Sequence, residues 1–282
     1  EPLYNRQTAI IRVNKFPPSV LKEILAYHNP NYTQDDLLAL YSFTGGVAKY
    51  VELLMDKGAT TRSKMIETIV QADSIFLSEG KNLLIEEFGK DYGIYFSILT
   101  AIASGHTQRS QIEDMIGKEI GGYLTMLEDS YGIIHKHKPL FTTKNSNIHY
   151  RLNDNFLTFW FRFLFKYNHM LEIEAFEALR QIIERDYETF SGKMLEQYFK
   201  EKLAEQQQFT RIDSWWSRNG ESEIDIIAIN EINKEAIFYE VKRQAKDIDL
   251  SLLQQRTKDF LVATRQLKRY AISHGGLSMQ DM

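Results

Sequence analysis

The last third of this 282-residue sequence contains two apolar segments, EIDIIAIN and EAIFYEVK, separated by the polar stretch EINK. β-Branched and aromatic residues on both sides of a short polar stretch predict a β-hairpin over residues 223–242. A helical segment precedes this hairpin in the sequence, and a helix and a strand follow it, which is an α/β pattern. We therefore expect a C-terminal α/β domain, with a long helical segment before the hairpin and a helix and a strand after it.

Three charged side chains interrupt the apolar character of this hairpin. With the turn over residues 231–234, Asp225 lies opposite Glu240, and Lys242 follows two positions later on the same face. Opposed side chains in an antiparallel pair have Cβ atoms about 5 Å apart. Carboxylates that close repel each other unless a cation lies between them, and Mg²⁺ prefers oxygen ligands of this kind. The pattern predicts a metal site on one face of the sheet.

An acid on an upstream helix adds a third ligand to this predicted site. Glu196 falls on the same side of the helical segment 190–206 as Leu195 and Phe199, which is the core-facing side. An acid on that side needs a positive partner, and a metal ion would supply one.

Roles can be assigned to these residues. The predicted metal ligands are Glu196, Asp225 and Glu240. The predicted catalytic residues are Lys242, Asp225 and Glu240. The lysine would orient or deprotonate a water molecule or stabilise charge in the transition state, and Gln254 on the next helix is a candidate for positioning the substrate. The competing interpretation is a surface hairpin in which Lys242 forms a cross-strand ion pair with Glu223 or Glu240.

The part of the chain before this domain has apolar residues at helical spacing, and a second predicted hairpin follows them. Residues 17–88 are predicted to form a small helical unit, and residues 92–131 to contain three further helices. Residues 133–152 alternate apolar and polar side chains around a polar turn. Three helices followed by a hairpin is the order of a winged helix-turn-helix. The aromatic run from Phe156 to Leu171 predicts one helix that is buried on several sides.

Charge and composition limit the partners and the compartment. The formal net charge is −4, so any nucleic-acid contact has to use a local basic patch. The absence of cysteine excludes disulfides and thiolate metal sites such as zinc fingers. The sequence shows neither the layout of a signal peptide nor an uncharged apolar stretch long enough to cross a membrane. We expect a soluble, cytoplasmic protein that has no membrane partner.

The predicted wing supplies a local basic patch, because residues 132–151 contain lysine and arginine but no acid. The residues expected to contact nucleic acid, from the wing and the helices before it, are Arg109, Lys118, Lys136, Lys138, Lys144 and Arg151. DNA is the expected partner, and a wing that docks a protein or links domains is the open alternative. We expect His135 and His137 to be surface residues of the wing, and Trp215 and Trp216 to pack in the sheet.

At the predicted metal site the sequence resembles the PD-(D/E)XK nuclease-like superfamily. The matching positions are Glu196 on a helix, Asp225 on a strand, and Glu240-Val241-Lys242 on the next strand, although no proline precedes Asp225. The resemblance implies a restriction-endonuclease-like α/β fold and Mg²⁺-dependent phosphodiester cleavage. Nuclease-like folds also occur without activity, so a non-catalytic domain is the alternative.

A wider resemblance covers most of the chain. The segments LYNR, FPPSVLKEIL, LYSFTGGVAKYVELL and YRLNDNFLTFWFRF look like the C-terminal part of archaeal and bacterial AAA-type ATPases (ATPase_2) that end in a DUF234 domain. This resemblance implies an α+β multidomain chain. Its parts would be an all-α ATPase lid at residues 1–88, a winged helix-turn-helix at 89–152 and a nuclease-like DUF234 domain at 153–282.

The same resemblance implies that the full-length protein binds ATP. The sequence has no Gly-x-x-x-x-Gly-Lys-Ser/Thr loop, so we expect no ATPase activity from this chain and a separate N-terminal ATPase module as its partner. Lys49 is a candidate for reaching a nucleotide phosphate in the complete protein, or is simply an exposed lysine. The expected function is DNA binding with Mg²⁺-dependent cleavage under ATP-driven control. The alternative is a non-catalytic protein-interaction or regulatory module of the ATPase.

Overall fold

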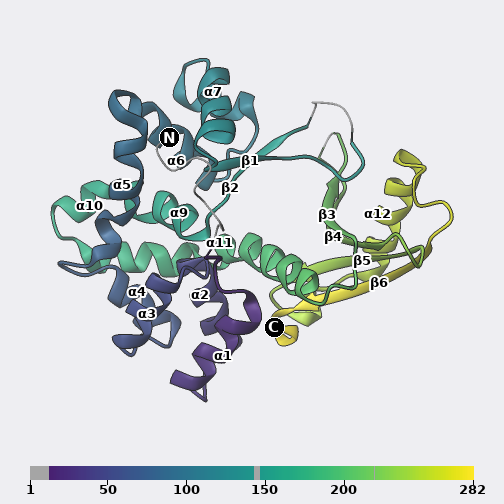
Figure 1. The fold of residues 1–282 in the computed structure, drawn as a ribbon, viewed down its shortest axis with the longest axis horizontal. Helices are drawn as coiled ribbons and strands as arrows, with labels where there is room; N and C mark the ends of the chain where they lie inside the picture. Colours follow the sequence, from purple (N-terminus) through teal and green to yellow (C-terminus); the bar gives the residue numbers. More distant parts are fainter. Residues whose placement is uncertain (1–12, 143–146, 219) are drawn as a thin grey trace, which may run out of the picture.

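The computed structural model describes residues 13–142, 147–218 and 220–282, and places a helical part beside a smaller sheet-containing part (Figure 1). Helix α11 (Phe176–Glu205) runs from the helical part to the sheet. The described ranges contain 12 α-helices and two sheets, which confirms the α+β class. None of the helices in these ranges combines the length and the apolar character that crossing a membrane requires.

Five helices begin the helical part: α1 (Pro18–His28), α2 (Gln34–Thr44), α3 (Ala48–Asp56), α4 (Arg62–Ile69) and α5 (Ile75–Phe88). Helix α2 begins at a capping box in which Thr33 and Asp36 each accept the other's backbone N–H. It ends at Gly45, which is left-handed with φ 58°. Most side chains of α2 are buried, so the neighbouring helices pack around it.

The next helices lead into a two-stranded sheet. They are α6 (Tyr92–Ala103), α7 (Arg109–Ile116) and α8 (Gly121–Thr125), and the strands are β1 (Ile134–His137) and β2 (His149–Leu152). The strands pair antiparallel, with Ile134 opposite Leu152. The predicted order of three helices and a hairpin is confirmed, although α8 is short and continues as a π-helical turn at Met126–Ser130.

The aromatic segment that follows is helical but is not one α-helix. Helix α9 (Asn155–Phe159) continues as a π-helical turn over Trp160–Phe165, and α10 (Asn168–Glu172) comes next. The indole of Trp160 donates to the Leu77 carbonyl at 3.1 Å and lies against Gly80, where a Cβ would come within 2.3 Å of the ring. The predicted continuous helix is therefore wrong. A π-helical turn holds an extra residue, which redistributes these large rings around the helix axis.

Four strands form the C-terminal sheet in the order β3-β4-β5-β6. They are β3 (Arg211–Trp216), β4 (Glu223–Asn230), β5 (Glu235–Lys242) and β6 (Ala271–Ser278), with α12 (Leu250–Ala263) between β5 and β6. The first three strands are antiparallel, and β6 is parallel to β5. Ile226 lies opposite Tyr239, so the predicted hairpin and its register are confirmed.

The two faces of this sheet pack against different helices. Ile226 of β4 belongs to the core that contains Phe199 of α11. Ile227 of the same strand, with Phe238 of β5, belongs to the core that contains Phe260 of α12. Because neighbouring residues of a strand point to opposite faces, α11 covers one face and α12 covers the other.

Candidate metal and nucleic-acid site

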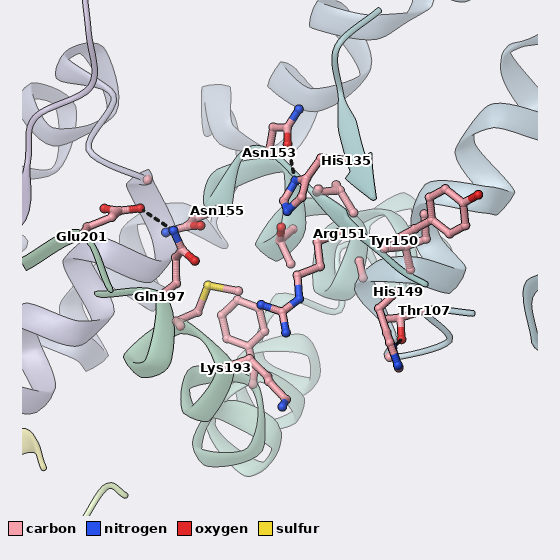
Figure 2. Close-up of a pocket in the computed structure, with 18 of the residues that line it drawn as sticks. Thr107, His135, His149, Tyr150, Arg151, Asn153, Asn155, Lys193, Gln197 and Glu201 are labelled. Carbon is pink, nitrogen blue, oxygen red and sulfur yellow. Dashed lines mark hydrogen bonds between the residues drawn. The ribbon is translucent and has the colours of Figure 1, made fainter. Parts of the chain in front are cut away.

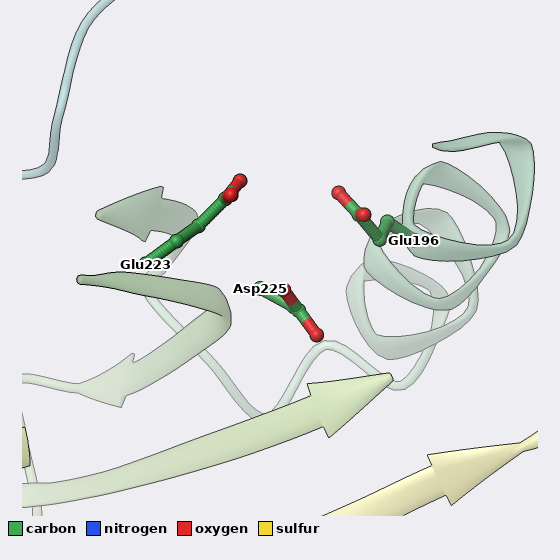
Figure 3. A group of neighbouring side chains, drawn as sticks. All are labelled: Glu196, Glu223 and Asp225. Carbon is green, nitrogen blue, oxygen red and sulfur yellow. The ribbon is translucent and has the colours of Figure 1, made fainter. Parts of the chain in front are cut away.

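Three carboxylates meet where α11 crosses β4 (Figure 3). Glu196 projects from α11, and Glu223 and Asp225 project from the first residues of β4. One oxygen of each lies within 4.8 Å of an oxygen of each of the others, and all three side chains are half-buried. We call these three residues the carboxylate group.

A β-bulge turns Asp225 toward α11. The pairing of β3 with β4 passes from Asp213 opposite Ile227 to Trp215 opposite Ile224, so β4 has one extra residue there. Ile224 and Ile227 both belong to the core on the α12 side, whereas Ile226 belongs to the core on the α11 side. Asp225 therefore shares the α11 face with Ile226 instead of alternating with it.

The electrostatic environment of the carboxylate group disfavours negative charge. Burial, and then the charge of Glu196, raise the pKa of Asp225 from 3.8 to about 6, although its Oδ2 accepts the Val241 N–H at 2.8 Å. Glu196 Oε2 is buried and accepts no hydrogen bond from the residues that the structure describes. Lys193 Nζ lies 3.4 Å from Glu196 and 3.5 Å from Glu223. Burial lowers the pKa of Lys193, but these two acids outweigh it and raise the pKa overall.

Glu240, predicted as the third ligand, lies on the other face of the sheet. It is 3% exposed, and its carboxylate accepts the Asp249 N–H at 2.6 Å. Its Oε1 lies 3.3 Å from Lys242 Nζ and 3.7 Å from Arg256, which is on α12. The prediction that Asp225 and Glu240 share one face is wrong, because the bulge turns Asp225 toward α11 while Glu240 keeps the face of α12.

The structure thus brings together two of the three predicted ligands, Glu196 and Asp225, and replaces Glu240 by Glu223. Glu223 stands two positions before Asp225, a spacing that places both side chains on one face of a strand. That spacing was the available signal for Glu223. Lys242 pairs with Glu240, and its charge also favours the ionised form of Asp225. Gln254, the candidate for substrate positioning, is exposed on α12.

A cleft of about 1230 Å³ lies between β2 and α11 (Figure 2). The lysines and arginines in its wall are Lys15, Arg151, Arg162, Lys193 and Arg218. Glu223 belongs both to this wall and to the carboxylate group. A polyanion in the cleft would therefore meet basic side chains beside Glu223, although Glu201 and Glu205 also line the wall.

The predicted nucleic-acid contacts divide into two sets. Lys136, Lys138 and Arg151 line a second cavity of about 520 Å³, and Arg151 also lines the cleft. Lys136 forms an ion pair with Glu128. Arg109 and Lys118 line neither cavity: Arg109 lies 2.7 Å from Glu113, and Lys118 donates to the Tyr123 hydroxyl at 3.1 Å. Lys144 lies outside the described residues.

Lys49, the residue proposed to reach a nucleotide phosphate, lies on α3 and pairs with Glu79 at 2.9 Å. Its side chain is 56% exposed, so this ion pair is open to solvent. The position agrees with the simpler interpretation of an exposed lysine near the start of a helix.

The hairpin β1–β2 packs against β3 of the C-terminal sheet. His137 Nε2 lies 3.0 Å from Asp213, and the Leu140 N–H donates to the Ser214 carbonyl at 3.0 Å. The Trp216 ring lies 4.8 Å from the ring of His137. His137 is 8% exposed, so its expected place on an exposed wing is wrong, because the hairpin contacts the sheet. Trp215 and Trp216 are buried at the sheet, as predicted.

Fold and site define a mixed α+β protein with an acidic group beside a basic cleft. Residues 160–263 match the family model of DUF234, described as archaeal bacterial proteins of unknown function, so the chain contains a DUF234 domain. An uncharacterised protein of Methanocaldococcus jannaschii is 30% identical over 261 residues. That alignment covers 88% of this chain and 56% of the relative, so the chain spans little more than half of the relative's length. No solved structure matches the chain.

Proposed function

We propose that this chain binds nucleic acid in the cleft between β2 and α11 and cleaves phosphodiester bonds at the carboxylate group with a divalent cation. The observation that carries the proposal is the position of Glu223, which lines the basic cleft and lies within 4.8 Å of Glu196 and Asp225. Polyanion binding and oxygen ligands for a metal are thereby adjacent.

The residues of the carboxylate group suit a hard divalent cation such as Mg²⁺. Three carboxylates from two elements offer oxygen ligands, and one buried oxygen of Glu196 accepts no hydrogen bond within the described ranges. Burial, and then the charge of Glu196, raise the pKa of Asp225, and a bound cation would oppose both effects. Glu196, Glu223 and Asp225 would hold the ion, which when bound activates water and stabilises charge on the phosphoryl oxygens.

The surrounding basic residues have separate roles in this proposal. Lys193 neutralises Glu196 and Glu223 when no other cation is present. Arg151 and Arg218, in the wall of the cleft, neutralise backbone phosphates and position the strand. Lys242 is held by Glu240 and adds positive charge near Asp225, where it favours the carboxylate form.

The family context enlarges the proposal. Residues 1–88 would be the lid of an AAA-type ATPase, residues 89–152 a winged helix-turn-helix, and residues 153–282 a PD-(D/E)XK-like domain. A full-length protein with an N-terminal ATPase module would use ATP to control the nucleic-acid site. The support is the order of three helices and a hairpin, the DUF234 match, and a relative that is longer than this chain.

The test is cleavage of labelled single-stranded DNA, duplex DNA and RNA by the purified chain with Mg²⁺ or Mn²⁺. We expect Glu196→Gln, Glu223→Gln and Asp225→Asn each to reduce cleavage at least about a hundredfold, as for loss of a metal ligand. Glu235→Gln, at an exposed position of β5, is the control and should cleave like the unaltered chain. Cleavage that survives all three substitutions would reject this site.

A second function is favoured by one observation. Lys193 already places an ammonium near both Glu196 and Glu223, and Glu240 has its own basic partners, so part of the negative charge is neutralised without a metal. The chain would then be a non-catalytic interaction or regulatory module of the ATPase. Absence of cleavage, together with no rise in melting temperature on adding Mn²⁺, would support this alternative over the nuclease.

A further inference from the structure

Arg151 lies at the wall shared by the two cavities and has no acidic partner among the residues that the structure describes. Within the described ranges no carboxylate oxygen lies within 4.0 Å of its guanidinium. The side chain extends from β2 toward α11, where Lys193 lies (Figure 2). Arginine pairs readily with carboxylates and phosphates because its planar fork matches their oxygens. An unpaired guanidinium that faces two cavities is therefore a candidate anion ligand.

Two lysines and a histidine lie close enough to Arg151 to be affected by its charge. Burial, and then repulsion from Arg151, lower the pKa of Lys200 to about 8. Burial also lowers the pKa of His137 to about 4, with Arg151 acting in the same direction. The charge of Arg151 opposes the raised pKa of Lys193 as well. Arg151, Lys193 and Lys200 repel one another around the cavities and produce a positive potential, which Glu196 and Asp213 offset in part and a bound anion would relieve further.

The arrangement of these groups comes from two elements. Lys193 and Lys200 are seven residues apart on α11, or two helical turns, which separates them by about 10 Å along the axis. Arg151 reaches toward them from β2. Lys200 Nζ donates one hydrogen bond, to Ser214 Oγ at 2.5 Å, and an ammonium has three N–H groups to donate.

The four acids in the cavity walls, Glu201, Glu205, Asp213 and Glu223, have partners of their own, and Glu205 accepts the Ser19 N–H at 3.4 Å. Asp213 pairs with His137, and Glu223 lies near Lys193. Glu201 accepts a hydrogen bond from Gln197 at 3.0 Å. Within the described residues none of these four acids lies within ion-pair distance of Arg151, so the arginine has no counterion there.

We infer that Arg151, Lys193 and Lys200 form a phosphate-binding subsite where the two cavities meet, beside the carboxylate group. A phosphate group offers several oxygens to cations that approach from different directions, which suits donors on both β2 and α11. The inference rests on the proposed function for the source of the phosphate, a nucleic-acid backbone. Inorganic phosphate has the same chemistry and provides a separate test.

The first arm measures binding of a fluorescent single-stranded oligonucleotide by anisotropy, in EDTA so that no cleavage occurs. We expect Arg151→Gln to weaken binding about tenfold and to reduce its salt dependence, because one phosphate contact is lost. Arg265→Gln removes the same charge from an exposed position and should bind within about twofold of the unaltered chain. Equal binding by the two variants would count against the subsite.

The second arm measures melting temperature in sodium phosphate against sodium chloride at equal ionic strength. Phosphate should stabilise the unaltered chain and Arg265→Gln, but not Arg151→Gln. In chloride, Arg151→Gln should melt no lower than the unaltered chain, because no internal partner is lost and repulsion is relieved.

The two arms separate the inference from the proposed function. Phosphate stabilisation that depends on Arg151, without oligonucleotide binding, would keep the subsite and reject a nucleic-acid backbone as its ligand. Equal phosphate stabilisation of Arg151→Gln and Arg265→Gln, with equal oligonucleotide binding, would overturn the subsite. An Arg151→Gln variant that melts well below the unaltered chain would show that Arg151 is structural and would also overturn it.

Discussion

The carboxyl group of Asp225 is held where its ionised form is disfavoured. Burial and the neighbouring Glu196 raise its pKa to about 6, and the hydrogen bond from the Val241 N–H opposes this only in part. A folded-state pKa above the unfolded value means that protonation favours the folded chain. The stabilisation is complete below the unfolded pKa near 3.8 and is lost as the pH rises through 6.

Asp225→Asn should therefore change stability in a way that depends on pH. We expect it to raise the free energy of unfolding by about 1–2 kcal/mol near pH 8 and to change it little near pH 4. The measurement is urea denaturation at both pH values without divalent cations. Glu235→Gln, at an exposed position of β5, serves as the control and should show no such pH dependence. A variant that is less stable than the unaltered chain near pH 8 would contradict the account of Asp225.

Among the elements, β4 shows which part of the site a local pattern can predict. Its register with β5 follows from an apolar pattern and a short turn, and both were predicted correctly. The bulge arises in the pairing with β3, near Asp213 and Trp215, and no local pattern in β4 encodes it. Glu196 and Asp225 could therefore be predicted as neighbours, whereas the separation of Asp225 from Glu240 could not.

The hairpin β1–β2 illustrates the same limit between elements. Its strands and its position after three helices were predicted from alternation, because that signal is local. Its contact with β3 is a tertiary contact, in which the rings of His137 and His149 pack on Trp216. A histidine in an alternating polar pattern carries no sign of such burial, so the sequence alone placed His137 on the surface.

Lowering the pH should weaken this contact between the hairpin β1–β2 and the sheet. Burial lowers the pKa of His137 from 6.5 to about 4 in spite of the bond to Asp213, so the neutral ring stabilises the fold above pH 6.5. That stabilisation, about 2–3 kcal/mol at most, is lost as the pH falls through 4. We expect a change in tryptophan emission between pH 6.5 and 4, because Trp216 contacts the ring.

His137→Phe keeps an aromatic ring and removes the titrating group, so this acid transition should disappear. His149→Phe is the matched control, because it replaces the other ring on Trp216 and leaves His137 in place. If the transition persists in His137→Phe, another group is responsible for it.

At the scale of the whole molecule, one ionic network joins the N-terminal helices to the C-terminal sheet. Asp35 of α2 accepts from Arg62 of α4 and from Arg243, which follows β5. Both guanidinium groups lie over the Tyr187 ring of α11, at 4.9 and 5.5 Å. Arg243 also donates to Ser191 Oγ at 2.5 Å. One aspartate therefore holds together four segments that are far apart in the sequence.

Asp35→Ala should weaken this connection, because it leaves two guanidinium groups over one ring without their shared acid. We expect a loss of about 2–3 kcal/mol in the free energy of unfolding, at the lower end for breaking a buried pair because these side chains are partly exposed. Asp56→Ala, at an exposed position on α3, is the control and should lie within about 0.5 kcal/mol of the unaltered chain.

The double variant Asp35→Ala/Arg243→Ala tests whether these two residues act as a unit. If they do, its destabilisation is smaller than the sum of the single losses by about 1–2 kcal/mol, because the second substitution removes the guanidinium that the first one left unpaired. If the losses in the free energy of unfolding are strictly additive, Asp35 does not stabilise the chain through Arg243. A coupling of that size would mean that a shift of α2 changes the interactions of Arg243, which directly follows Lys242. The N-terminal helices would then be energetically coupled to the edge of the carboxylate group.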